Sequence, residues 1–255
     1  KNEIKNLGNQ TGYIDKESLP TLGTVSRNQN GYPIGYFFGY KAIGVFQTQE
    51  EIDNYISPAT GKPIQPNAVP GDTKFEDLNG DGVISDDNED RTMIGKPNPD
   101  WMVGLTVAAD WNGFDLSAFF QGSFGADVFD ALRRYELAAV NYTSDALERW
   151  TGPGTSNSMP RIVLGDTPKN FRPSTLLVHD ASFLRLRNLQ VGYTLPAQLT
   201  RKAYIQRLRF YASFDNLLTI TGYKGMDPEI GSTMGIDKGV YPQARVYTFG
   251  LNLTF

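Results

Sequence analysis

Apolar and polar residues alternate strictly over the last ten positions of the chain, VYTFGLNLTF from Val246 to Phe255. Successive side chains of an extended strand point to opposite faces, so Tyr247, Phe249 and Leu251 share one apolar face, which the same spacing continues to Phe255. Small or polar residues occupy the other face. The pattern predicts an amphipathic strand over 246–255 that ends on an aromatic residue.

Four earlier runs show the same alternation, at 101–111, 114–121, 188–195 and 208–215, and each is about as long as a strand that crosses a bilayer at a tilt. The first has Trp at both ends of its apolar stripe, and the Asn112-Gly113 dipeptide after it is a two-residue hairpin signal. Repeated apolar stripes capped by aromatic residues are typical of outer-membrane β-barrels. We therefore predict an all-β membrane barrel whose polar, inward-facing positions include Asp110, Asp115, Gln121 and Gln190.

Composition excludes several kinds of membrane segment, site and partner. Hydrophobic residues make up 40% of the chain, and no apolar run reaches the roughly 18 residues of a transmembrane helix. The chain has no cysteine, which excludes disulfides, thiol nucleophiles and zinc–thiolate sites. Its net charge of −4 argues against nucleic acid as a partner, because phosphate binding needs a basic surface.

Two long polar segments, 47–99 and 124–173, interrupt the strand pattern, as long extracellular loops do in barrels of this kind. The second is predicted to contain short amphipathic helices over 126–141 and 143–150, with Ser144 as a helix cap. The first strand-like run, 35–46, has no obvious hairpin partner. We therefore expect part of a larger barrel rather than a closed eight-stranded one.

A calcium-type sequence lies within the first polar segment. Asp77, Asn79 and Asp81, followed by Gly82, match the Asp-x-Asn-x-Asp-Gly opening of a calcium loop, in which alternate side chains and the Val83 carbonyl point at one ion. The pattern predicts a structural calcium site. The alternative is a solvated acidic turn held by side-chain to backbone hydrogen bonds.

The far end of this loop departs from the calcium pattern. Ser85 occupies position nine, and Asn88 occupies position twelve, where a bidentate Glu normally closes the site. Glu89 and Asp90 follow one and two residues later. Either of them is a candidate for the last ligand, provided that the loop bulges, and otherwise the site is weak.

The sequence gives little support for catalysis. The single histidine, His179, precedes Asp180, but neighbours in a strand point to opposite faces and cannot form the hydrogen bond that a catalytic triad needs. No Gly-x-Ser-x-Gly motif accompanies them, and no spacing singles out a glycosidase carboxylate pair. We predict that the chain is not an enzyme.

Six segments in this order resemble the C-terminal part of SusC/RagA-family TonB-dependent transporters, which occupy the outer membrane of Bacteroidetes. They are PIGYFFGYKAIGVFQ, FEDLNGDGVI with RTMIGKPNPDW, RWTGPGTSNSMPR, DASFLRLRNLQVGYTLP, DNLLTITGYKGMDPE and GVYPQARVYTFGLNLTF. The resemblance covers nearly the whole chain. Within it, SDDNED at 85–90 looks like a small insertion, and Asp90, just before Arg91-Thr92, is the ligand candidate that fits the family pattern.

The resemblance implies a barrel of about 22 strands, of which this chain supplies the last third. The family places its plug domain and TonB box N-terminally, so we expect them outside this chain. Family members import glycan oligosaccharides or oligopeptides, are energised through TonB–ExbB–ExbD, and work with a SusD-like surface lipoprotein as a lid. Phe255, as an aromatic terminus, is expected to be the signal that the barrel-assembly machinery reads.

One other class of protein accommodates several of these features. A soluble extracellular β-sandwich that uses calcium for stability and binds carbohydrate or mediates adhesion would explain the acidic loop, the aromatic residues and the lack of cysteine. It does not explain aromatic-capped stripes of membrane-crossing length. In a sandwich, those stripes would face an interior rather than lipid.

Overall fold

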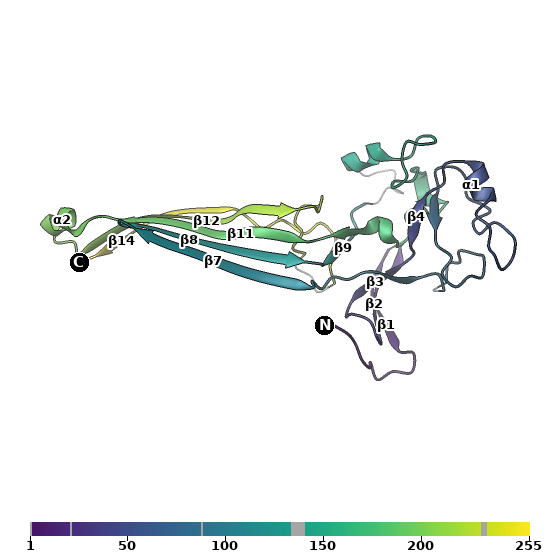
Figure 1. The fold of residues 1–255 in the computed structure, drawn as a ribbon, viewed down its shortest axis with the longest axis horizontal. Helices are drawn as coiled ribbons and strands as arrows, with labels where there is room; N and C mark the ends of the chain where they lie inside the picture. The colour runs from purple at the N-terminus through teal and green to yellow at the C-terminus, as the bar shows by residue number, and fades with distance from the viewer. Residues whose placement is uncertain (1, 21, 88, 134–140, 231–233) are drawn as a thin grey trace. The chain divides into compact units, whose positions relative to one another are not determined.

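The computed structural model describes residues 1–255 except 1, 21, 88, 134–140 and 231–233. It divides into two compact units (Figure 1). Unit 1 consists of Lys1–Asn98, Asp127–His179 and Ile230–Gly239, and unit 2 consists of Pro99–Ala126, Asp180–Glu229 and Val240–Phe255. Strands account for 41% of the residues, so the predicted all-β class is confirmed.

Unit 2 is built on one antiparallel sheet of five long strands in the order β14-β12-β11-β8-β7 (Figure 1). The short helices α2 (Ala197–Thr200) and η4 (Arg201–Ala203) connect β11 to β12. Within the described residues, β7 and β14 form the two edges of the sheet. The strands are β7 (Trp101–Trp111), β8 (Phe114–Phe124), β11 (Phe183–Thr194), β12 (Arg207–Thr221) and β14 (Val246–Thr254).

A two-residue turn joins β7 to β8, as predicted. Asn112 and Gly113 both have positive φ, at 47° and 86°, which suits the twist of an antiparallel hairpin. Trp111 pairs with Phe114 directly beside the turn. Residues Val246–Thr254 of the terminal run form β14, which pairs with β12 along its whole length.

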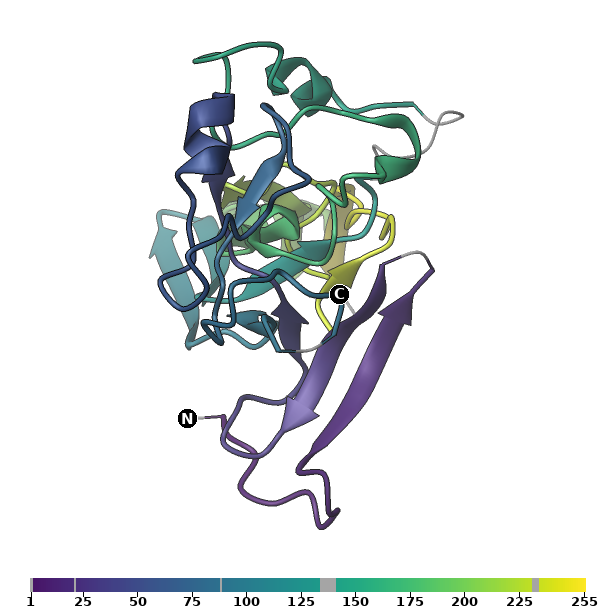
Figure 2. The ribbon, with the colours of Figure 1, turned by 90° about the vertical axis from the view of Figure 1, so that its right-hand side faces the viewer.

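Unit 1 contains three small sheets and several short helices. The four-stranded sheet has the order β1-β2-β3-β6, and β1 and β2 form the purple hairpin of Figure 2. A second sheet pairs β4 with β5, and a third has the order β10-β9-β13. The strands are β1 (Tyr13–Leu19), β2 (Gly23–Gln29), β3 (Tyr36–Gly39), β4 (Ala42–Val45), β5 (Thr73–Phe75), β6 (Thr92–Gly95), β9 (Asp127–Asp130), β10 (Val178–Asp180) and β13 (Ile236–Asp237). The helices are α1 (Gln49–Asp53), η1 (Ser144–Glu148), η2 (Leu164–Asp166) and η3 (Thr175–Leu177).

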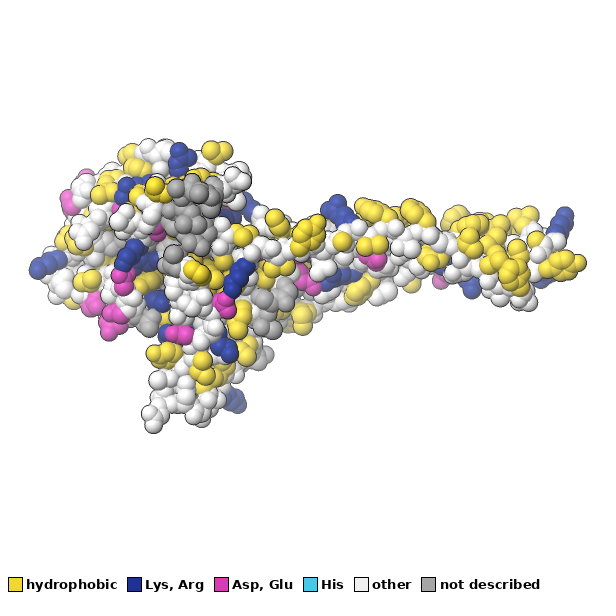
Figure 3. Space-filling model, turned by 180° about the vertical axis from the view of Figure 1, so that it is seen from behind, with side chains coloured by type: hydrophobic (Ala, Val, Ile, Leu, Met, Phe, Trp, Pro, Cys, Tyr) yellow, Lys and Arg dark blue, Asp and Glu magenta, His cyan; other side chains and the backbone are white. Residues whose placement is uncertain are grey.

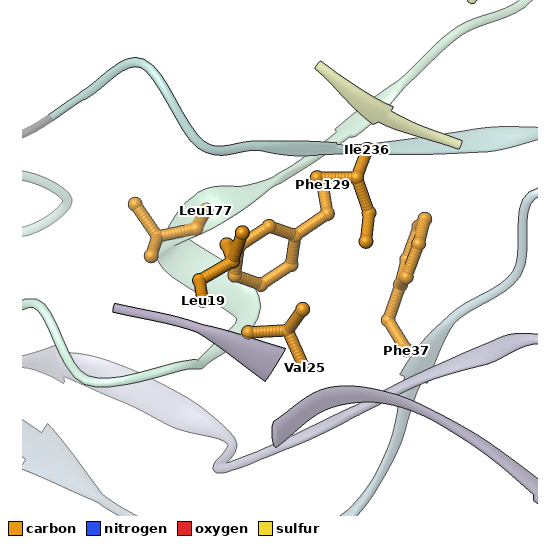
Figure 4. Packing of buried hydrophobic residues seen from close by; sticks show 6 residues of the cluster. All are labelled: Leu19, Val25, Phe37, Phe129, Leu177 and Ile236. Atoms are coloured by element: carbon orange, nitrogen blue, oxygen red, sulfur yellow. The ribbon is translucent and has the colours of Figure 1, made fainter. Parts of the chain in front are cut away.

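Residues far apart in the sequence form the hydrophobic core of unit 1 (Figure 4). The rings of Phe37 and Phe129 lie 5.9 Å apart between centroids, and both side chains are fully buried. Burying a side chain of this size contributes about 1.5–3 kcal/mol to stability. The cluster consists of Leu19, Val25, Phe37, Phe129, Leu177 and Ile236.

The run 35–46 differs from the single strand that its sequence suggested. It forms two short strands, β3 and β4, in different sheets. Tyr36, Phe37 and Phe38 are all buried, so this segment has no alternating apolar face. The chain approaches its neighbour closely where the strand ends, because a Cβ on Gly39 would lie 2.4 Å from the Pro173 carbonyl oxygen.

The predicted helix over 126–141 is wrong at its start, and positions 134–140 lie outside the described residues. Residues Asp127–Asp130 form β9, because Val128 and Phe129 are buried and the strand pairs in parallel with β13. The second helix is the short η1, and Ser144 does not cap it. Thr143 occupies the cap position and makes no capping hydrogen bond through its side chain. No helix in the described part of the chain is long and apolar enough to cross a membrane.

Candidate functional site

The apolar stripes of unit 2 lie in register across neighbouring strands and are exposed. Trp101 pairs with Phe124 at one end of the β7–β8 hairpin and Trp111 pairs with Phe114 at the other. The two Trp side chains are 73% and 76% exposed. Hydrophobic side chains gather along this sheet in Figure 3. Exposed apolar area on this scale marks an interaction surface, and aromatic residues at both ends match the girdles of a membrane barrel.

The last strand continues the same surface. Leu251 lies opposite Phe210, and Phe249 lies opposite Ala212. Phe249 and Phe255 are each 75% exposed. The soluble-sandwich alternative requires these stripes to be covered by protein, whereas in this structure the stripes of β7 and β14 are exposed.

The opposite face of the sheet is polar and internally hydrogen-bonded. The Arg209 guanidinium donates from Nε to Asp115 Oδ1 at 2.8 Å and from Nη2 to Gln190 Oε1 at 3.2 Å. Asn188 Nδ2 donates to Asp215 Oδ1 at 2.7 Å. Asp115, Gln121 and Gln190 therefore share one face, as predicted, and Asp110 lies opposite Asp115 in the register.

A β-bulge interrupts this face at Arg187. Pairing of β11 with both β8 and β12 shifts between Leu186 and Asn188, so Arg187 has no direct partner in either register. Arg187 Nε donates to Gln121 Oε1 at 2.7 Å, which shows that the bulge turns this side chain to the polar face. The alternation of the sequence alone does not place this arginine on the polar face.

A buried ion network lies next to the bulge. Arg185 is 2% exposed and donates to Asp227 at 2.6 Å, to Glu229 at 3.0 Å and to the Thr219 hydroxyl at 2.9 Å. Arg187 contacts both carboxylate oxygens of Glu229 at 2.6 Å. These contacts tie residues 227–229 to the polar face of the sheet.

Electrostatics stabilise the charged form of Asp227. Burial by itself would raise the pKa of this carboxyl. The backbone N–H groups of Gln243 and Glu229, together with the Arg185 guanidinium, outweigh that effect and hold the pKa below its ordinary value. The network was not predicted, because Arg185 and Asp227 are 42 residues apart in sequence and no local pattern pairs them.

The acidic loop of unit 1 folds as a series of side-chain to backbone turns. Asp77 accepts from the N–H of Gly80 at 2.8 Å and from the N–H of Gly82 at 2.9 Å. The Asn79 and Asp81 side chains each accept from the backbone N–H two residues later. Gly82 has a φ of 87°, and a Cβ there would meet Ser57 at 2.7 Å, so the turn requires glycine.

Glu89 and Asp90 have different surroundings. Asn79 Nδ2 donates to Glu89 Oε2 at 3.0 Å and to Asp81 Oδ2 at 2.9 Å, so these three side chains lie together. Asp90 is fully buried, and its two oxygens accept from the N–H groups of Leu78 and Ser85. Asp90 therefore links the backbone at Leu78 to the backbone at Ser85. Glu89 instead lies beside Asn79, which also contacts Asp81.

The described residues contain no group of three or more His, Cys, Asp or Glu side chains placed to hold a metal ion. Asn79 and the Val83 carbonyl, which the calcium pattern also uses, do not belong to those four residue types. The Val83 side chain is 56% exposed. The predicted calcium site thus stays a prediction.

Known proteins are similar to this chain in sequence and in fold. It is 34% identical to TonB-dependent receptor P3 of Formosa agariphila over 238 residues, which are 89% of this chain and 23% of that protein. It is 30% identical to TonB-dependent receptor SusC of Bacteroides thetaiotaomicron, and the match covers 100% of this chain and 23% of SusC. No family model matches the chain.

Solved structures of a RagAB peptide importer are similar to this chain in fold. The RagAB peptide importer in its open-open state matches 99% of this chain and 25% of its own, with 26% sequence identity and a TM-score of 0.71. The closed-closed state gives 0.69 at the same identity. This chain belongs to the SusC/RagA family of TonB-dependent receptors. It spans about a quarter of the length of the relatives it matches.

Membership of the SusC/RagA family explains the two faces of unit 2. The five-stranded sheet is part of the wall of a large β-barrel, so its apolar face is the outer surface and its polar face is the inner one. The bulge at Arg187 and the Arg185 network therefore lie on the inner face of the wall.

Two further side chains of this SusC/RagA chain, His179 and Tyr36, lie close to partners within unit 1. His179 lies in β10 with Nε2 3.9 Å from Asp130, while the Asp180 carboxylate accepts from the Ser182 N–H. Tyr36 is buried and stacks on Tyr32 at 4.9 Å, and burial raises its pKa to about 12. The named relatives are receptors and importers rather than enzymes.

Proposed function

We propose that the protein to which this chain contributes imports large nutrients across the outer membrane of a Gram-negative, Bacteroidetes-type cell. The exposed apolar stripes of unit 2, capped by Trp101 and Trp111, are the observation that carries this proposal, because they suit a wall surrounded by lipid. The relatives named TonB-dependent receptor support active, TonB-dependent transport. This chain acts as wall and loops.

The partners follow from the same family. A SusD-like surface lipoprotein closes the extracellular mouth, and TonB–ExbB–ExbD supplies energy through the plug domain that family members carry N-terminally. The cargo is a glycan oligosaccharide or an oligopeptide. RagAB is described as a peptide importer, and SusC as a TonB-dependent receptor, so the relatives leave both cargo types as candidates.

Uptake by cells tests this function. Cells that carry the full-length gene should accumulate a labelled oligosaccharide or oligopeptide, and accumulation should stop when the gene is deleted or a protonophore collapses the proton gradient. Restoring the gene should restore uptake. Accumulation that continues unchanged without the gene, over a panel of both cargo types, would contradict the proposal.

We also propose that calcium binds the acidic loop of unit 1 and stabilises it. Asp77, Asn79 and Asp81 present side-chain oxygens whose orientation is set by backbone N–H groups, and a carboxylate has further lone pairs to offer an ion. The contact of Asn79 with Glu89 makes Glu89 the better candidate for the last ligand. Bound calcium supplies positive charge that offsets repulsion among these carboxylates.

Limited proteolysis tests the calcium proposal. Chelator should speed cleavage within 47–99 while the strands of unit 2 stay intact, and added calcium should reverse the effect. Asp77→Ala should abolish the protection by calcium. Glu76→Ala is a matched control, because Glu76 is an exposed neighbour that pairs with Lys41. Equal cleavage of this loop in chelator and in calcium would contradict the proposal.

A further inference from the structure

A cavity of about 360 Å³ opens in unit 1 between the segments around Asp86 and Lys169. Three basic side chains line it, namely Arg91, Lys169 and Arg172, and Tyr40 and Phe171 add aromatic surface. Of its two carboxylates, Asp166 accepts from the N–H groups of Asn170 and Phe171. The lining thus carries three basic side chains against two carboxylates, and Asp86 is the carboxylate that pairs with Lys169.

Arg172 packs between two aromatic rings at this cavity. Its guanidinium carbon lies 4.7 Å from the centroid of the Tyr40 ring and 4.9 Å from that of Phe75, and its side chain is 14% exposed. Nε donates to the Lys169 carbonyl at 3.2 Å. Nη1 is buried, has no hydrogen-bond partner among the described residues, and lies 4.0 Å from Asp86 Oδ1. This donor is in place for an anion.

Asp86 lines the cavity as an exposed counterion. Its carboxylate pairs with the Lys169 ammonium, which lowers the pKa of Asp86. The side chains of Asp86 and Lys169 are 67% and 51% exposed. An ion pair that exposed contributes little to stability, so another carboxylate can replace Asp86 without unfolding the segment.

We propose that this cavity binds a carboxylate group of the cargo, which displaces Asp86 and pairs with Lys169 and the free edge of Arg172. The protein's own carboxylate at this position shows which chemistry the basic pair accepts. A planar guanidinium and a neighbouring ammonium suit a carboxylate better than a neutral hydroxyl. Tyr40 and Phe171 provide apolar surface for the part of the cargo next to the charge.

This inference rests on the proposed import function and adds the charge class of the cargo. A cargo carboxylate has two sources, a uronic acid in a glycan and a Glu or Asp side chain in a peptide. Both present the same group to Lys169 and Arg172, so the sources are separated by the probes used.

The test measures binding to the purified full-length transporter by titration calorimetry. The glycan arm uses a galacturonate oligosaccharide and its methyl ester, and the peptide arm uses a Glu-containing peptide and its Gln counterpart. The variants are Asp86→Asn and Lys169→Gln, both at exposed side chains. The Lys41–Glu76 pair gives matched controls, Glu76→Gln and Lys41→Gln, because it is an exposed ion pair at 3.2 Å in the same unit and outside the cavity.

Asp86→Asn should tighten binding of the acidic probe about two- to fivefold, because it removes the internal competitor. Lys169→Gln should weaken it by a similar factor. Neither variant should alter binding of the neutral probes, and the control variants should behave as the unmodified protein. The arm that shows this pattern identifies the source of the carboxylate.

The inference is overturned if neither acid binds, if both variants leave acid binding unchanged, or if the neutral probes shift equally. Uptake measured in the same variants separates this result from the import function. Import of a cargo without the binding pattern would refute the cavity proposal alone, whereas the binding pattern without any import would refute the import function alone.

Discussion

Replacing Asp227 with Ala should loosen the backbone at Glu229 and Gln243, whose N–H groups it binds. The substitution removes the 2.6 Å contact with Arg185 and the acceptor for the N–H groups of Glu229 and Gln243, at 2.9 and 3.0 Å. Removing one partner of a buried ion pair typically costs about 3–5 kcal/mol. Because Glu229 and Thr219 still contact Arg185, we expect the lower end, about 3 kcal/mol.

Amide hydrogen exchange on the full-length protein measures this loss. The N–H groups of Glu229 and Gln243 should exchange about 150-fold faster in the Asp227→Ala variant, which is the factor that corresponds to 3 kcal/mol. Asp180→Ala is the control, because that carboxylate is exposed and accepts one backbone N–H, from Ser182 at 2.8 Å. Exchange that rises less than about threefold at both amides would refute the reasoning.

The same carboxyl gives a pH dependence. Because the pKa of Asp227 is lower in the folded protein than in the unfolded chain, its contribution is complete above the unfolded value of about 4. It is lost as the pH falls through the folded value. Exchange at Glu229 and Gln243, corrected for intrinsic rate, should therefore be constant from neutral pH down to about pH 4 and rise only below it.

Two further changes test the roles of Phe255 and Asp90. Deleting Phe255 should lower the surface level of the full-length protein, measured by surface labelling of intact cells, while Phe255→Tyr should retain it, because we expect the assembly machinery to read an aromatic terminus; normal levels after deletion would count against this role. Asp90→Ala should destabilise the acidic loop by about 2 kcal/mol, since it leaves the N–H groups of Leu78 and Ser85 without their acceptor. Faster proteolysis within 47–99 would show this, the exposed Asp53→Ala variant should not change it, and equal rates in the two variants would speak against the role of Asp90.

The two faces of the five-stranded sheet could be predicted because they depend only on the alternation of side chains along each strand. Alternation over 101–111 and 246–255 places apolar residues on one side whatever the partner strand is, and the observed register keeps Trp101, Trp111 and Phe249 on that side. The Asn112-Gly113 turn was likewise predictable from two residues. The calcium pattern is also local and predicts the turns of the acidic loop. Those turns form through side-chain to backbone hydrogen bonds, so they do not decide whether an ion binds.

The parts that were missed depend on contacts between distant residues. Asp127–Asp130 forms a strand because Ile236 and Asp237 provide a partner more than a hundred residues later, and no local signal indicates that pairing. Arg187 faces inward because of a bulge that shifts the alternation by one residue. A strict two-residue period would have placed it on the apolar face.

Lipid is expected to surround the apolar face of the five-stranded sheet. Spin labels placed one at a time along β7 of the full-length protein in lipid vesicles test it directly, with collision rates measured for oxygen, which concentrates in lipid, and for a water-soluble nickel complex. Labels at Val103, Leu105 and Val107 should collide with oxygen most often, and those at Gly104, Thr106 and Ala108 should not, which gives a two-residue period. Collision rates without that period, or with low oxygen access at the three apolar positions, would contradict the account.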